Sequence, residues 1–131
     1  MAILDDIGTL LAAQIGSLTL GTSLFLGRLP DEPATCVALF ETGGEAPVNT
    51  MGGGLYEMEQ PRIQVLTRGA SYSATHALAL SVWLELEAIV NETVTSSNYQ
   101  RVTAIQSPFP LERDSQDRII FSQNFRVQKN R

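Results

Sequence analysis

Apolar residues recur at helical spacing in two segments of the chain. Near the N-terminus this spacing predicts an amphipathic helix over residues 2 to 15. A second helix is predicted from Ser71 to Val90, with one wide apolar stripe that suits the face of a sheet. The stripe consists of Tyr72, Leu78, Ala79, Val82, Trp83, Leu86, Ile89 and Val90. Leu80 and Leu84 form a second, narrower apolar patch on the far side, which we expect the first helix or a neighbouring subunit to cover.

Five shorter segments have the apolar pattern of strands. They are residues 22 to 26, 34 to 41, 62 to 68, 98 to 106 and 118 to 128. The first two could pair or merely be neighbours, whereas the last two are predicted to pair. The order of helix, three strands, helix and two strands predicts an α+β fold. We expect a mostly antiparallel sheet of about five strands with two helices packed on one face.

The connection between the second and third predicted strands is unusually rich in glycine. The stretch FETGGEAPVNTMGGG, residues 40 to 54, holds five of the ten glycines of the chain. It predicts a long flexible loop at residues 43 to 55. Two interpretations stay open for this loop: a hairpin tip, or an arm that becomes ordered on a partner.

Length and composition restrict the classes of protein that fit. With 131 residues, 44% of them hydrophobic, the chain is expected to form a single domain with one core. Cys36 is the only cysteine, and its apolar neighbours predict a core residue. The N-terminus has aspartates where a signal peptide has cations, and no apolar run reaches membrane-spanning length. We therefore expect synthesis in the cytoplasm and no membrane partner.

Charge is unevenly distributed along the sequence. Eight acidic residues and one base, Arg28, lie in residues 1 to 60, whereas six bases and three acids follow residue 98. The formal net charge of −5 argues against a surface that neutralises nucleic-acid phosphates. The asymmetry fits a solvated surface with internal ion pairs, and it also fits a head-to-tail contact between copies.

Residues for known catalytic and cofactor chemistry are scarce. His76 is the only histidine, and no second histidine or cysteine lies at metal-ligand spacing from it. The sequence has no G-x-S-x-G nucleophile motif, no phosphate-binding G-x-x-x-x-G-K-[ST] and no G-x-G-x-x-G that opens a helix. We therefore predict no catalytic, cofactor-binding or metal-binding residue, and a protein that is not an enzyme.

Four motifs, in order along the chain, resemble the tail terminator proteins of long-tailed bacteriophages, some of which are called minor capsid proteins. They are GRLPD at residues 27 to 31, ETGG at 41 to 44, VLTRG at 65 to 69 with Tyr72, and SPFPLERD at 107 to 114. The resemblance covers most of the chain, from about Ile3 to Val127.

The resemblance implies a structural role in the virion, at the head-proximal end of the tail. Such proteins form a hexameric ring on the finished tail tube, stop its growth and present the surface that joins the head. The implied partners are copies of this chain, the tail tube protein and a head-tail connector or stopper protein. DNA would pass through the lumen without specific binding, and we hypothesise that acidic residues line that channel.

Candidate interface residues follow from the loop, the arginines and the second patch of the long helix. In the loop they are Gly43, Gly44, Asn49, Met51 and Gly53; elsewhere they are Arg68, Arg113, Arg118, Leu80 and Leu84. Arginine is suited to bidentate pairing with carboxylates across an interface. Three alternatives stay open: another head-tail connector or tail tube component, a small enzyme or ligand-binding domain based on His76, and a nucleic-acid-binding module.

Overall fold

The computed structural model describes residues 3–48, 58–94 and 97–130. Its two helices are α1 (Ile3–Gln14) and α2 (Tyr72–Glu87). The strands in this part of the chain are β1 (Leu24–Leu26), β2 (Cys36–Val48), β3 (Met58–Gly69), β4 (Val90–Val94), β5 (Ser97–Ala104), β6 (Phe109–Arg113) and β7 (Ile119–Asn130). The two helices and the five predicted strands are all present, with bounds that differ from the predicted ones mainly at the strand ends.

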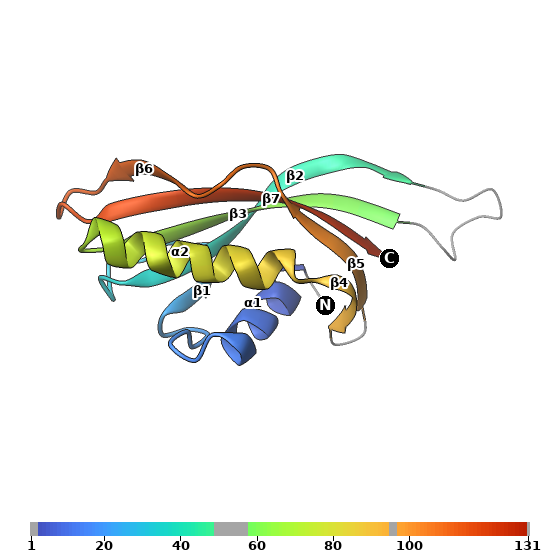
Figure 1. The fold of residues 1–131 in the computed structure, drawn as a ribbon, viewed down its shortest axis with the longest axis horizontal. Coiled ribbons are helices and arrows are strands. Elements are labelled where there is room, and N and C mark those ends of the chain that lie inside the picture. The colour runs from blue at the N-terminus through green and yellow to red at the C-terminus, as the bar shows by residue number, and fades with distance from the viewer. Residues whose placement is uncertain (1–2, 49–57, 95–96, 131) are drawn as a thin grey trace.

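The strands form one curled sheet in the order β1-β2-β3-β7-β5-β4, and β6 pairs with the part of the β7 edge that β5 leaves free (Figure 1). All pairings are antiparallel except that of β1 with β2, which is parallel. The α+β class is confirmed, and so is the pairing of the last two predicted strands, as β5 and β7. The sheet is larger than the predicted five strands, since seven strands belong to it in the described part of the chain, and the parallel pair β1–β2 makes it mixed.

The two strands that the sequence pattern missed, β4 and β6, both lie at an edge of the sheet. β4 is exposed at four of its five positions and β6 at all five, so neither alternates between buried and exposed residues. Pro110 also lies within β6, and proline in a strand is typical of an edge. A strand without a buried face lacks the period-2 signal that sequence reasoning depends on.

Both helices lie against one face of the sheet, below it in Figure 1, as predicted. We call this the helix face and the opposite side the open face. The core between the layers is built from α1 (Ile3, Ile7, Leu11), α2 (Val82, Leu86) and alternate residues of the central strands (Val37, Leu39, Ile63, Val65, Val102, Phe125, Val127). Burying these side chains is the main favourable term in the folding of such a layer.

The buried stripe of α2 is narrower than the sequence predicted. Tyr72 is 54% exposed and Val90 is 66% exposed, although both were expected in the core. Val90 lies outside the helix because α2 ends at Glu87 and the chain turns into β4. Tyr72 lies in the first turn of α2, where its ring is 5.3 Å from the ring of Phe121 but stays open to solvent on its other side.

A buried hydrogen bond joins α1 to the sheet. The hydroxyl of Tyr99 in β5 donates to Oδ2 of Asp6 over 2.6 Å, and both side chains are fully buried. Burial and this contact with Asp6 raise the pKa of the Tyr99 hydroxyl well above its usual value. The phenol therefore stays a donor, and it fixes α1 at one position along the sheet.

Candidate functional site

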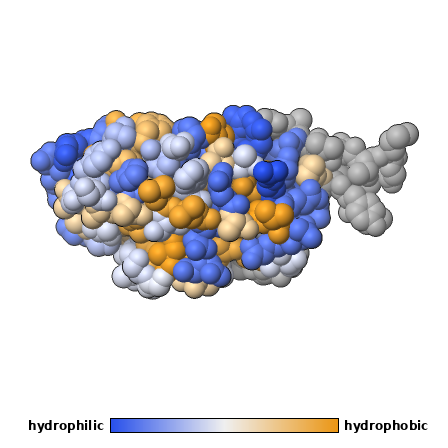
Figure 2. Space-filling model, in the orientation of Figure 1, coloured by the Kyte–Doolittle hydropathy of each residue, from blue (hydrophilic) through white to orange (hydrophobic). Residues whose placement is uncertain are grey.

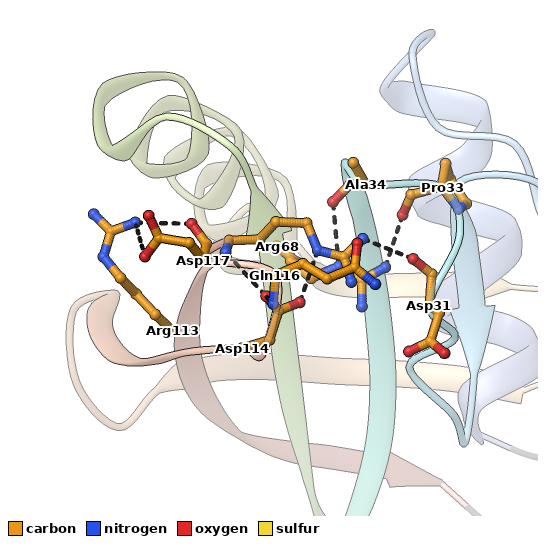
Figure 3. A network of polar contacts seen from close by, with 9 residues as sticks. Asp31, Pro33, Ala34, Arg68, Arg113, Asp114, Gln116 and Asp117 are labelled. Carbon is orange, nitrogen blue, oxygen red and sulfur yellow. Dashed lines mark hydrogen bonds and ion pairs between the residues drawn. The ribbon is translucent and has the colours of Figure 1, made fainter.

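Two buried arginines hold the connection between β1 and β2 in place (Figure 3). Arg68, in β3, is only 2% exposed. Its Nη2 donates to the carbonyl oxygen of Pro33 over 2.7 Å, and its Nε donates to that of Ala34 over 3.2 Å. Cys36, the register partner of Arg68 in β2, is fully buried, and this burial raises the pKa of its thiol. The prediction that Cys36 is a core residue is confirmed.

Arg118 ties the same connection to the turn between β6 and β7. Its Nη1 donates to the carbonyl oxygen of Asp31, and its Nε donates to Oδ2 of Asp114, each over 2.7 Å. The backbone N–H groups of Arg118 and Gln116 donate to Oδ1 of Asp114 over 2.9 and 3.0 Å. Mainly because of the backbone hydrogen bond from Arg118, the pKa of the Asp114 carboxyl lies below its usual value.

The structure thus places the three predicted interface arginines differently. Arg68 and Arg118 are buried, and their guanidinium groups contact atoms of their own chain. Arg113 is exposed, with Nη1 donating to the carbonyl oxygen of Asp117 over 3.0 Å and lying 3.6 Å from the carboxylate Oδ1 of Asp117. An exposed pair of this kind contributes little to stability, so Arg113 is the arginine best placed to exchange partners on assembly. Sequence reasoning could not separate the three, because the carbonyl groups that bind Arg68 and Arg118 are distant in sequence.

The first part of the glycine-rich segment, residues 40 to 48, belongs to strand β2. β2 continues through Val48 and β3 begins at Met58, so the predicted loop at 43 to 55 was too long at its N-terminal end. The register of the two strands shifts between Glu41 and Gly44, where Gly43 has a φ of +85°. A Cβ on Gly44 would overlap the carbonyl oxygen of Gln60, so both glycines are required by this bulge. Asn49, Met51 and Gly53 lie outside the described residues.

His76, on which the enzyme alternative was based, is surrounded by aromatic rings. His76 is half-buried, stacked on Tyr72 with ring centroids 6.2 Å apart and edge-on to Phe121 at 5.5 Å. Within residues 3–48, 58–94 and 97–130, no three His, Cys, Asp or Glu side chains come together as a metal site. A hollow of about 280 Å³ lies instead along the β2–β3 hairpin, between Glu41, Gly44 and Arg62. His76 therefore packs as one member of an aromatic cluster.

Comparison with known proteins agrees with this arrangement of strands and helices. A model of the bacteriophage tail terminator protein family matches residues 12–131. The chain belongs to that family. The resemblance noted from the sequence is therefore confirmed, and the chain is a structural protein of the virion tail.

A solved structure gives an independent likeness in fold. A chain in the virion of a native gene transfer agent (GTA) particle superposes with a TM-score of 0.64, covering 99% of this chain and 98% of that one at 16% sequence identity. No curated protein sequence matches the chain. Neither helix of this tail terminator family member, in its described part, is long and apolar enough to cross a membrane.

The described part of this tail terminator domain has two strips of apolar side chains that are exposed to solvent. The first is on α2, where Leu84 is 63% exposed and Leu80 is half-buried, so α1 does not cover the patch predicted there. Figure 2 shows hydrophobic residues gathered over α2 in the middle of the visible face. The second strip, which sequence reasoning missed, comprises Ile105, Phe109 and Leu111, in and just before β6. In SPFPLERD the apolar Phe109 and Leu111 are two residues apart, which is the spacing of one strand face, but the prolines of the motif favoured a turn.

Proposed function

We propose that this protein caps the tail tube as a ring of identical subunits, stops its polymerisation and provides the surface on which the head is joined. The observation that carries the proposal is the match of the tail terminator family model to residues 12–131. The proposed ring has six subunits, the number that the sequence resemblance implies. The ring contacts the tail tube protein on one side and a head-tail connector or stopper protein on the other, and DNA passes through its bore.

The surface of the described residues supports a role in assembly. Seven large apolar side chains are exposed, and five of them belong to α2 or to the segment that leads into and forms β6 (Tyr72, Leu84, Ile105, Phe109 and Leu111). Contiguous exposed apolar surface is typical of protein–protein contacts. The interface residues proposed from the sequence keep their place on this basis: Leu80, Leu84 and Arg113 as exposed or half-exposed contacts, and Gly43, Gly44, Arg68 and Arg118 as residues that shape the segments around them.

Tail length is the direct test of the capping role. Tails assembled with and without this protein are compared by electron microscopy, in otherwise identical particles. We expect tubes of uniform length when the protein is present and overgrown tubes, without heads, when it is absent. Tails that stop at their normal length without the protein would refute the proposal.

The purified protein distinguishes a cap from a tube component. A tube subunit polymerises with itself into long tubes, whereas a terminator adds one ring to an existing end and then stops. We expect short rings at most in negative-stain images of the concentrated protein. Long tubes built from this chain alone would favour the tube alternative.

A further inference from the structure

The outer surface of α2 is built to be covered. Between Tyr72 and Leu84 this helix has no charged residue, although its outer side faces solvent. The exposed positions between these two residues are small, namely Ser73, Ala74, Ala77 and Ser81, and Leu84 is exposed next to the half-buried Leu80. An ordinary surface helix has charged residues on its solvent side. We call Ala77, Leu80, Ser81 and Leu84 the helix strip.

The polar group on the helix strip does not oppose burial. The hydroxyl of Ser81 donates to the carbonyl oxygen of Ala77 over 3.1 Å, within the same helix. A hydroxyl that is already bonded loses little when water is removed, whereas an unbonded one would cost free energy. The helix strip can therefore pack against an apolar partner without leaving a donor unpaired.

The second exposed strip lies at the edge of the sheet and suits a helix better than a strand. We call Ile105, Phe109 and Leu111 the edge strip. It flanks β7, because the backbone N–H of Ile105 donates to the backbone carbonyl of Asn124 and Phe109 is the register partner of Ser122. Among the described strands β6 pairs only with β7, and Pro110 removes one of its backbone donors. Such an edge resists the addition of another strand but leaves its side chains free for packing.

We propose that the helix strip of one copy packs on the edge strip of the next copy. The two strips lie on different sides of the molecule, since β6 follows the upper margin of the sheet and α2 lies below it (Figure 1). Each copy therefore uses both strips, and the contact runs head to tail, which is the kind of contact that closes a ring. This inference rests on the proposed ring, and it deepens it by assigning the subunit interface.

Charge favours this pairing over a symmetrical one. Glu85 and Glu87 follow Leu84 on the helix, whereas the oppositely charged Glu112 and Arg113 follow Leu111 on the edge strand. Packing the helix strip against its own copy would bring the glutamates of both copies together. Packing the helix strip on the edge strip avoids this repulsion, because the edge strand has Arg113 beside Glu112 and so carries no net negative charge there, and such charge differences select the partner.

Disulfide cross-linking tests the contact in the full-length protein. The variants are Leu84→Cys and Leu111→Cys, one of them carrying a mass tag, and both change exposed side chains. The native Cys36 is fully buried and gives little background. We expect a cross-linked heterodimer when the two variants are mixed and oxidised, and none from either variant alone. Leu20→Cys, exposed but outside both strips, is the matched control and should not cross-link with either variant.

The outcomes separate this inference from the capping role. Dimers from Leu84→Cys alone would show a symmetrical contact, and a mixture that gives no more product than the Leu20→Cys control would show that the strips do not meet; either result overturns the proposed interface. The tail-length comparison is independent of both. Tails that need the protein for normal length, together with failed cross-linking, would keep the terminator role and reject this interface.

Discussion

Replacing Arg68 with methionine tests whether the buried guanidinium shapes the connection between β1 and β2. The change removes two hydrogen bonds, of 2.7 Å to the Pro33 carbonyl and 3.2 Å to the Ala34 carbonyl. A hydrogen bond from a charged donor contributes about 1.5–3 kcal/mol. Methionine fills similar space and removes the cost of keeping a cation away from water, which offsets part of the loss. We therefore expect the free energy of unfolding to fall by about 2–3 kcal/mol.

Thermal unfolding of dilute protein measures this loss. With an unfolding entropy of about 2.1 cal/mol/K per residue, each kcal/mol lowers the Tm of a 131-residue chain by about 3.6 °C. Arg68→Met should therefore unfold about 7 to 11 °C below the wild type. The matched control is Arg113→Met, whose exposed contacts with Asp117 should change the Tm by less than about 2 °C. Equal Tm values for the wild type and Arg68→Met would refute the structural role, and loss of self-association without loss of stability would return Arg68 to the interface.

Three further predictions concern the core, the hairpin and the β6–β7 turn. Tyr99→Phe leaves the buried Asp6 carboxylate without its hydroxyl donor and should lower the free energy of unfolding in urea by about 1–3 kcal/mol. Gly44→Ala places a methyl group against the carbonyl of Gln60 and should lower the Tm by several degrees. Asp114→Asn should lower the Tm at neutral pH, since the folded-state pKa of the carboxyl lies below its ordinary 3.8 and its ionised form stabilises the fold. That difference should shrink as the pH falls below about 4 toward the folded-state pKa.

Each of these changes has a control or a contrary result. Tyr72→Phe alters an exposed phenol and should leave the urea midpoint unchanged. Gly16→Ala adds a methyl group in open space and should be close to neutral, so an equal loss in both glycine variants would contradict the bulge argument. A difference between Asp114→Asn and the wild type that stays constant down to pH 3 would show that charge plays no part in this turn.

Segments whose period matches a buried face could be predicted closely from the sequence. The first helix was expected over residues 2 to 15 and spans Ile3–Gln14, and the last strand was expected over 118 to 128 and spans Ile119–Asn130. In both, one face is buried in the core, so packing imposes the repeat that the pattern reports. β6 has no such face. Its exposed Phe109 and Leu111 are separated by Pro110 and followed by charged residues, so the segment resembles a turn in sequence.

The candidate site depends on contacts that no local pattern carries. The bond between Arg118 and the carbonyl of Asp31 joins residues 87 positions apart, and the acceptor is a backbone atom that any residue would supply. The requirement for glycine at position 44 also depends on a residue that is distant in sequence. Its need for a small residue comes from Gln60 across the hairpin, whereas the sequence alone shows only a run of glycines, which is typical of a loop.

Part of the basic charge at the C-terminal end of the sequence is paired within the chain. The C-terminal segment supplies Arg118, which binds Asp31 and Asp114, and Lys129, whose Nζ lies 3.7 Å from Oε2 of Glu59. The bond from Arg118 to Asp31 ends on a backbone carbonyl, and Asp114 lies only four residues from Arg118, so Lys129 with Glu59 is the ion pair of these that joins the basic end of the sequence to its acidic first half. Less charge is then available between copies, and affinity between subunits must come mainly from apolar area. The helix strip and the edge strip provide that area. Glu85 and Arg113, which lie beside them, mainly affect which surfaces pair.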